Sequence, residues 1–254
     1  MKASCSLWSA DLLALRSAIQ LLSGHADEFH IDVMDGICVP DILFGLDFVA
    51  AVRGTTDTPL DVHLMTRTDL GIVDRAVAAG ASRLAIHSSF CANVRGVLRH
   101  IENLGAMPVL VIPLDMAIEE RSIPWGFFQR VLVMGTEIGI KGVDLDARIP
   151  ERIRTLGGFR TTLGLSFEIF VDGGIRSTTA PLLAAAGADG IVPGSLVFKA
   201  PDPVAAVDWI HSLGDTIGRS GDVPIAGRRK VAEAHARSRR SLSRGKPSVT
   251  MTRF

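Results

Sequence analysis

The chain has 254 residues, of which 27 are basic, 27 are acidic and 47% are hydrophobic. This composition is typical of a globular domain with a full core. It argues against a disordered chain or a membrane protein, since no apolar run reaches the length of a membrane span. The charge is unevenly placed: from Arg219 onward there are ten Lys or Arg but two Asp or Glu, which leaves residues 1–218 with a formal net charge of −8.

Short apolar runs alternate with helical patterns along residues 3–213. We predict strands at 3–7, 28–34, 60–65, 83–87, 108–112, 131–134, 168–171 and 190–193. We predict helices at 10–23, 47–53, 69–79, 92–104, 116–120, 150–156, 178–186 and 203–213. Eight such repeats favour a single-domain α/β fold, a closed parallel (β/α)8 TIM barrel, over an open doubly wound sheet. The first strand and helix also explain the apolar start of the chain, where Asp11 and Arg16 argue against a signal peptide.

The periodic pattern ends after Gly218. Residues 219–254 are rich in Ser and Arg and show no apolar stripe. We therefore predict a barrel domain at 1–218, followed by a basic, flexible C-terminal tail at 219–254. A basic run can also bind nucleic acid, but a solvated tail is the simpler interpretation and the one favoured here.

Polar side chains share a face with apolar ones on two predicted strands. Residues alternate along a strand, so His30, Asp32 and Met34 face the same way, and a second strand presents His63 in similar company. Burying a carboxylate is costly unless something pairs with it, and a metal ion is one such partner. A third strand ends at Asp172. We predict that His30, Asp32, His63 and Asp172 converge on one metal ion.

Two other polar residues nearby have simpler explanations. Asp61 shares a face with His63, and we interpret it as a hydrogen-bonded acid of the barrel interior. His87 is interpreted as a core histidine whose hydrogen bonds are satisfied locally. Neither residue is therefore assigned to the predicted site.

Four motifs resemble the ribulose-phosphate 3-epimerase family, with which allulose-6-phosphate 3-epimerases are grouped. They are SCSLWSADLL at 4–13, HIDVMDG at 30–36, LDVHLM at 60–65 and VDGG at 171–174, and the likeness runs from about residue 3 to residue 212. The resemblance implies a TIM barrel isomerase of carbohydrate metabolism that inverts C3 of a ketose phosphate. Its substrate would be ribulose 5-phosphate, giving xylulose 5-phosphate in pentose phosphate metabolism, or allulose 6-phosphate, giving fructose 6-phosphate.

The resemblance also implies roles for individual residues. In the family, two His and two Asp hold one divalent metal ion, and here these are His30, Asp32, His63 and Asp172. Asp32 and Asp172 would also serve as acid and base, passing the C3 proton while the metal stabilises an enediolate. Mixed nitrogen and oxygen ligands accept zinc, iron, manganese or cobalt, so the metal is not specified.

Substrate-binding positions carry over from the family in the same way. The substrate-contacting serine is Ser6, His63 also lies next to the substrate, and the methionines lining the reaction face are Met34, Met65 and Met134. The phosphate loops correspond to Gly139, Lys141 and Gly142, to Gly173 and Gly174, and to Gly194 and Ser195. One loop departs from the family, because Pro-Gly-Phe-Gly-Gly-Gln becomes Glu-Ile-Gly-Ile-Lys-Gly at 137–142. Lys141 either adds a cation for the phosphate or pairs with Glu137 at the surface.

Other interpretations remain open from the sequence. The chain could be an epimerase of another ketose or tetrulose phosphate, a non-catalytic sugar-phosphate-binding barrel, or a phosphate-barrel lyase related to hexulose-phosphate synthase or orotidine-phosphate decarboxylase. Those lyases use an Asp-x-Lys-x-x-Asp strand, in which His63 replaces the Lys. The resemblance further implies a homo-oligomer. Three cysteines without disulfide or metal-finger spacing favour a cytoplasmic location.

Overall fold

The computed structural model describes residues 1–121 and 123–215, so the predicted tail at 219–254 lies outside the described residues. The strands in this range are β1 (Lys2–Ser6), β2 (Glu28–Asp35), β3 (Ile42–Leu43), β4 (Leu60–Met65), β5 (Arg83–His87), β6 (Met107–Ile112), β7 (Arg130–Met134), β8 (Glu168–Asp172) and β9 (Gly190–Val192). The α-helices are α1 (Leu15–Leu22), α2 (Leu46–Arg53), α3 (Leu70–Ala78), α4 (Val94–Asn103), α5 (Ile149–Thr162), α6 (Ala180–Ala186), α7 (Ser195–Phe198) and α8 (Pro203–Asp215). Two 3-10 helices, η1 (Leu7–Ser9) and η2 (Ser88–Phe90), follow β1 and β5.

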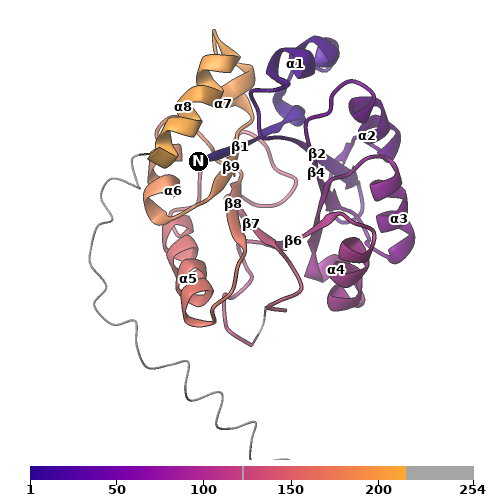
Figure 1. Cartoon of the computed structure of the whole chain (residues 1–254), viewed down its shortest axis with the longest axis vertical. Coiled ribbons are helices and arrows are strands. Elements are labelled where there is room, and N and C mark those ends of the chain that lie inside the picture. The colour runs from indigo at the N-terminus through magenta and orange to yellow at the C-terminus, as the bar shows by residue number, and fades with distance from the viewer. Residues whose placement is uncertain (122, 216–254) are drawn as a thin grey trace, which may run out of the picture. The chain divides into compact units, whose positions relative to one another are not determined.

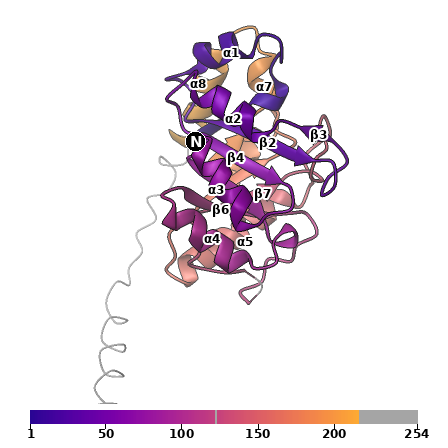
Figure 2. The ribbon, with the colours of Figure 1, turned by 90° about the vertical axis from the view of Figure 1, so that its right-hand side faces the viewer.

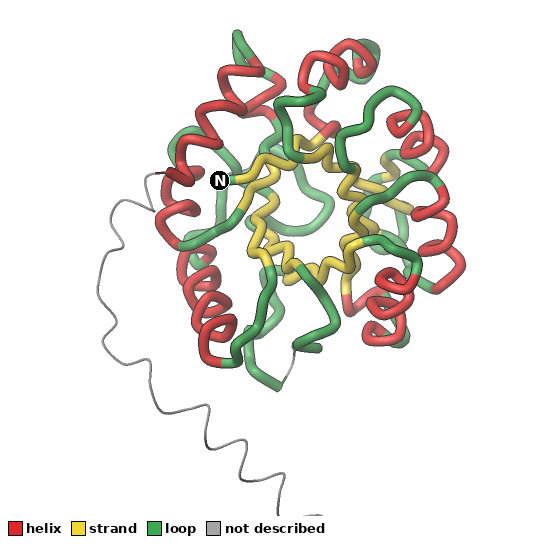
Figure 3. Tube along the Cα trace, viewed as in Figure 1, coloured by secondary structure: helices red, strands yellow, loops and turns green. Residues whose placement is uncertain are grey.

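The strands close into a parallel barrel. The sheet order is β1-β9-β8-β7-β6-β5-β4-β2-β3, and β1 also pairs with β2, which joins the two ends of the sheet. The strands form a closed ring with the helices outside it (Figures 1 and 3). β3 is a short antiparallel addition to the end of β2, set to one side of the barrel in Figure 2. All eight predicted strands are present, and the predicted (β/α)8 fold is confirmed.

The helices differ from the prediction mainly between β6 and β7. The predicted helix at 116–120 is wrong, because the described residues of this connection contain turns and bends instead. Aromatic side chains pack here in place of a helix: the Trp125 ring lies 5.9 Å from Phe128 and 5.8 Å from Phe167, measured between centroids. Two smaller errors concern ends, since α5 continues to Thr162 and α1 begins at Leu15 after the 3-10 turn.

The barrel interior has an apolar side and a polar side. Alternate residues of each strand face inward, and the apolar inward set is Ala85, Val109, Val111, Leu132, Met134, Phe170 and Val192. Most polar inward residues lie on β1, β2 and β4, and among them Ser4, Ser6, His30, Asp32, Asp61 and His63 are all buried. Within residues 1–121 and 123–215, no helix is long and apolar enough to cross a membrane.

A buried ion-pair network closes the barrel where the strands begin. Arg130 donates to both carboxylate oxygens of Glu28 at 2.8 and 2.7 Å, and its Nε and Nη2 donate to Glu168 at 3.0 and 2.6 Å. Its guanidinium also lies 3.6 Å from the centroid of the Phe170 ring. Lys2 pairs with Glu168 from the surface. These residues all lie at or near the first position of their strands, so the opposite, C-terminal end of the barrel is the one left open for a site.

Candidate active site

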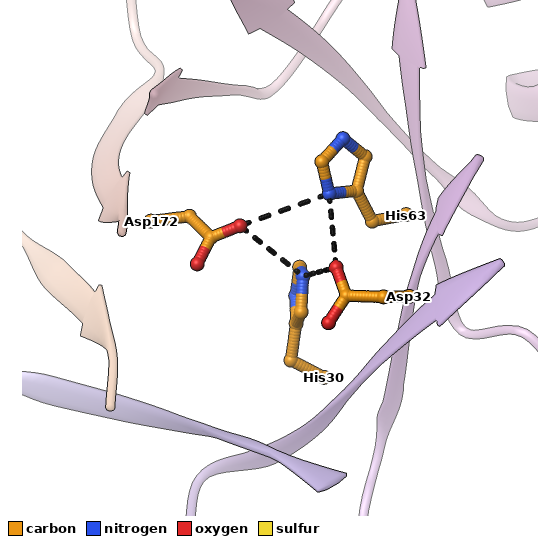
Figure 4. Close-up of side chains that lie close together, drawn as sticks. All are labelled: His30, Asp32, His63 and Asp172. Carbon is orange, nitrogen blue, oxygen red and sulfur yellow. Dashed lines mark hydrogen bonds and ion pairs between the residues drawn. The ribbon is translucent and has the colours of Figure 1, made fainter. Parts of the chain in front are cut away.

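The structure brings together the four side chains that the sequence predicts to meet. Asp32 Oδ1 lies 3.2 Å from His30 Nε2 and 3.3 Å from His63 Nδ1, while Asp172 Oδ2 lies 3.7 Å from each of the same two nitrogens. All four donor atoms lie within 4.8 Å of one another. Figure 4 shows the result: carboxylates and imidazoles alternate around a small central space, with Asp172 facing Asp32 across it.

The β strands impose this convergence. The register between β2 and β4 pairs His30 with Asp61 and Asp32 with His63. The inward side chains of each pair therefore lie side by side, and the second pair lies directly after the first along the strands. Asp172 is the last residue of β8, and β1 and β9 separate β8 from β2 in the sheet. The two carboxylates therefore approach the centre from different sides of the barrel, near the end where TIM barrels carry their sites.

The donor set fits a divalent metal ion. Metal–ligand bonds of about 2.0–2.2 Å place neighbouring donors of a tetrahedral site about 3.3–3.6 Å apart, close to the four separations observed. His63 Nδ1 points to the centre of the group and is a buried nitrogen without a hydrogen-bond partner. Such a nitrogen is costly unless it binds something. The residues present thus suit a cation held by two nitrogens and two oxygens.

The two carboxyl groups differ in proton affinity. Burial raises the pKa of Asp32, but the adjacent His30 and His63 rings outweigh burial and hold that pKa well below its usual range. Burial raises the pKa of Asp172 to about 6, because the same rings are farther from it and offset less of the cost. Burial alone would lower the pKa of His30, yet Asp32 and Asp61 raise it well above its usual value. These opposite shifts mark a cluster of the kind found at functional sites.

A cavity of about 430 Å³ opens above this cluster. Asp32 and Asp172 reach its floor, and Met65, Met134 and Val192 supply apolar wall. It is also lined by the three loops predicted to bind phosphate, namely Gly139, Lys141 and Gly142, Gly173 and Gly174, and Gly194 and Ser195. One cavity is therefore lined both by the two carboxylates of the cluster and by the glycine-rich loops.

Gly173 and Gly174 are required by the backbone at the phosphate-type loop. Their φ angles are +97° and +69°, a region that favours glycine. A Cβ on Gly174 would lie 2.5 Å from the backbone of Leu145, and one on Gly173 would lie 2.4 Å from Thr136 Oγ1. No side chain fits at either position, so the peptide groups of this loop are left bare beside the cavity, as backbone binding of an anion requires.

Three further predicted residues have distinct positions. Ser6 lines the cavity and donates its hydroxyl to Asp32 Oδ2 at 3.2 Å. Met34 packs against Val39 and Met65 and is not part of the cavity wall, unlike Met65 and Met134. Lys141 donates from Nζ to the carbonyl of Trp8 at 2.5 Å, with Nζ 5.2 Å from the centroid of the indole ring. The alternative pairing of Lys141 with Glu137 is not formed among the described residues.

The sequence interpretation missed two cations near the glycine-rich loops. Arg176 and Lys199 both line the cavity beside Lys141. Burial, and the nearby charge of Lys199, lower the pKa of Lys141. Arg176 follows Gly174 by two residues, and Lys199 comes directly after the helix that begins at Ser195, so their spacing from the predicted loops was an available signal.

The same architecture occurs in solved structures with low sequence identity. Orotidine 5′-phosphate decarboxylase from Pyrococcus horikoshii OT3 has a TM-score of 0.58 and 18% identity, covering 84% of this chain and 99% of its own. A structure of KGPDC from Streptococcus mutans has a TM-score of 0.64 and 14% identity, covering 85% and 97%. The shared fold defines the class as a TIM barrel, a fold whose sites lie at the C-terminal strand ends, where the polar cluster and the cavity are found here.

Sequence comparison places the chain more narrowly. Residues 2–198 match the model of the ribulose-phosphate 3 epimerase family, and this chain belongs to that family. The ribulose-phosphate 3-epimerase of Treponema pallidum is 34% identical over 195 residues, covering 76% of this chain and 89% of its own length. That of Bacillus subtilis (strain 168) is 33% identical over 213 residues, covering 83% and 98%. The predicted enzyme class, a carbohydrate epimerase among the isomerases, is confirmed.

Proposed function

We propose that this chain is a metal-dependent 3-epimerase that interconverts ribulose 5-phosphate and xylulose 5-phosphate. The observation that carries the proposal is the alternating group of two Asp and two His, whose carboxylates line a cavity that is also lined by glycine-rich loops and by cationic side chains. The names of the relatives support the pentulose phosphate as substrate. Allulose 6-phosphate, a ketose phosphate one carbon longer, is the alternative within the same reaction type.

His30, Asp32, His63 and Asp172 would hold one divalent cation. When bound, the cation supplies positive charge beside the ketone oxygen and the neighbouring hydroxyl oxygen, where negative charge develops as C3 loses its proton. Zinc, iron, manganese and cobalt all suit two imidazoles and two carboxylates. These four residues therefore form a site for a cation without specifying which one.

Asp32 and Asp172 are suited to move the C3 proton. Inversion removes the C3 proton from one face of the substrate and returns a proton to the other face, so two groups must stand on opposite sides of the carbon. Asp32 extends from β2 and Asp172 from β8, and they face each other across the centre of the site (Figure 4). One carboxylate accepts the proton while the opposite carboxylic acid donates one, and reversal of the roles runs the reaction backward.

The glycine-rich loops of the cavity are suited to the phosphate. Bare peptide groups at Gly173 and Gly174 allow close approach of an anion, and Lys141, Arg176 and Lys199 add positive charge. Arg176 is held in place by the carbonyls of Ile175 and Val143, at 3.0 and 3.3 Å. Anchoring the phosphate here fixes the reach of the sugar to the carboxylates, so C3 of the correct substrate stands between them.

A panel of pentulose, hexulose and tetrulose phosphates tests the proposed substrate. Purified metal-loaded protein is incubated with each compound, and the epimeric product is identified by NMR. The proposal expects ribulose 5-phosphate to have the highest kcat/KM and free ribulose to react far more slowly, because it lacks the anchored group. A higher kcat/KM for allulose 6-phosphate would replace the substrate but keep the reaction. Absence of C3 inversion with every compound would contradict the proposed function.

A further inference from the structure

The two histidines of the proposed metal site present different ring nitrogens to its centre. His30 turns Nε2 inward, while its Nδ1 is 2.9 Å from Asp61 Oδ2. His63 is reversed: Nδ1 faces inward and Nε2 lies 2.8 Å from His87 Nε2. Each ring thus turns one nitrogen toward Asp32 and the centre of the site, and its other nitrogen is engaged by a residue behind it. Asp61 and His87 are the residues in question, and neither lines the cavity.

Asp61 determines which nitrogen of His30 carries hydrogen. Its side chain is fully buried, and an ionised carboxylate only accepts hydrogen bonds. His30 Nδ1 must therefore be the donor, so a neutral His30 ring, the form that can bind a cation, has its lone pair on Nε2. Asp61 is itself held by Ser4 Oγ at 3.5 Å and by the charge of Arg130, whose Nη1 lies 3.9 Å from Asp61 Oδ2. A continuous series of contacts thus joins the ion-pair network at the N-terminal ends of the strands to the proposed metal site.

His87 has the corresponding position behind His63. The side chain is buried, and its ring meets that of His63 through the two Nε2 atoms, with the ring planes 19° apart and the centroids 5.0 Å apart. The centroid of the Phe90 ring lies 4.8 Å from that of His87. A neutral imidazole has one acceptor nitrogen. If Nε2 of His87 is that acceptor, Nε2 of His63 carries the hydrogen and Nδ1 of His63 is left with a lone pair. His63 Nδ1 is then the nitrogen left for a cation, and the hydrogen of His87 lies on Nδ1. That atom is buried without a hydrogen-bond partner, so the sequence interpretation of His87 as a core histidine with locally satisfied hydrogen bonds is wrong.

We infer that Asp61 and His87 are positioning residues that fix the tautomer and orientation of His30 and His63 for a divalent cation. The two supports differ in chemistry. Asp61 brings a negative charge, which makes the His30 ring a stronger electron donor, whereas His87 is neutral and supplies only the hydrogen-bond acceptor. This inference rests on the metal site proposed above and extends it to residues that touch neither the cation nor the substrate.

Cobalt(II) binding by the full chain tests the supports without using catalysis. Metal-free protein is titrated with Co²⁺, the visible absorption of the bound ion is recorded, and the dissociation constant is measured by competition with a chelator. Asp61→Asn keeps the shape of the side chain but removes its charge. We expect it to bind Co²⁺ about 10- to 100-fold more weakly, with a shifted visible spectrum. The matched control is Asp27→Asn, because Asp27 also accepts from a histidine, His211 Nε2, at 2.9 Å but outside the site.

Two substitutions of His87 separate a hydrogen-bonding role from a packing role. His87→Gln retains an acceptor for His63 Nε2 and should preserve Co²⁺ affinity within about threefold, whereas His87→Leu removes the acceptor and should weaken binding about 10- to 100-fold. His100→Gln, at a half-buried histidine outside the site whose Nε2 lies 2.6 Å from Asp74 Oδ1, is the control. Circular dichroism and thermal melting of the metal-free proteins report whether each variant folds. If Asp61→Asn does not fold, the comparison of His87→Gln with His87→Leu tests the positioning role.

The outcomes distinguish this inference from the proposed metal site. Wild-type affinity and spectrum in both Asp61→Asn and His87→Leu would overturn the positioning role while leaving the metal site intact. Equal losses in His87→Gln and His87→Leu would show that packing, not an acceptor, matters at His87, and would also overturn it. If the wild-type protein bound no Co²⁺, the metal site and the inference would fail together.

Discussion

Arg130→Met removes the central cation of the ion-pair network at the N-terminal ends of the strands, and it keeps most of the apolar bulk of the Arg130 side chain. Arg130 is fully buried, and two of its nitrogens donate to Glu28 at 2.8 and 2.7 Å. Methionine can still cover the Phe170 ring, over which the guanidinium lies at 3.6 Å. The change therefore isolates the loss of charge and hydrogen bonds from the loss of packing.

The expected cost follows from the burial of Glu28. That carboxylate is 1% exposed, and without Arg130 its remaining ion pair is with Arg83 Nε at 3.4 Å. Breaking a buried ion pair by removing one partner costs about 3–5 kcal/mol in the free energy of unfolding. For a domain of this size, that is a fall in Tm of about 6–20 °C. Arg130→Met/Glu28→Met should be more stable than Arg130→Met alone, because the Glu28 charge is then no longer buried without its main partner.

The deficit should also depend on pH. Burial raises the pKa of Glu28, and Arg130 holds that increase in check. Without Arg130 the pKa rises further, so the folded state keeps its proton at pH values where the unfolded state has lost it. Below the pKa that it has in the unfolded state, a carboxyl group of this kind does not lower the free energy of unfolding. As the pH rises from there toward the pKa that it has in the folded state, it lowers the free energy of unfolding progressively. The stability deficit of Arg130→Met should therefore be larger at pH 8 than at pH 5.

Urea unfolding at the two pH values measures this deficit for Arg130→Met against wild type. Arg154→Met is the control, since Arg154 forms an exposed pair with Glu151 at 3.1 Å and should change stability by less than about 0.5 kcal/mol. A loss below about 1 kcal/mol at pH 8, or a deficit that grows on acidification, would refute the reasoning.

Three other predictions concern the cavity and its cation. Lys199→Ala and Arg176→Ala should each raise KM for a ketose phosphate several-fold with a smaller change in kcat, and an unchanged KM in both would remove them from phosphate binding. Chelation should abolish activity and lower Tm, and added metal should restore both. A cation at 100 times its Kd stabilises the folded state by about 2.7 kcal/mol, so the change in Tm should be measurable. The same Tm with and without metal would argue against the site. Gly174→Ala should destabilise the loop and raise KM, since its Cβ would lie 2.5 Å from the backbone of Leu145. The control is Gly157→Ala in α5, which has open space around it and should preserve stability. Equal effects of the two substitutions would show that the left-handed backbone at Gly174 does not matter.

The sequence predicted the barrel and the polar cluster well because both follow from strand periodicity. The two-residue repeat of β2 places His30 and Asp32 on one face, and parallel register then sets His63 beside Asp32. Asp172 could be added because it ends a strand, and the ends of barrel strands meet at one rim. What the resemblance to a family contributed was the role of each residue, which periodicity alone does not provide.

The features that were missed depend on contacts between elements distant in the sequence. The connection after β6 has turns and bends at 116–120 instead of the predicted helix, and farther along it Trp125 packs against Phe167, which precedes β8. Local propensity at 116–120 does not report how such a connection packs. Asp61 was interpreted as an interior acid and His87 as a core residue. Their distances to His30 and His63, which join β2 to β4 and β4 to β5, could be obtained only from the folded chain.

Deuterium incorporation from heavy water is the most direct test of the central claim, that Asp32 and Asp172 move the C3 proton from opposite sides. Wild-type protein with bound metal should introduce deuterium at C3 of the ketose phosphate as it forms the epimer, and Asp172→Asn should lower the rate of inversion about 100- to 10,000-fold. Inversion without deuterium at C3, or wild-type turnover in both Asp32→Asn and Asp172→Asn, would contradict the two-carboxylate account.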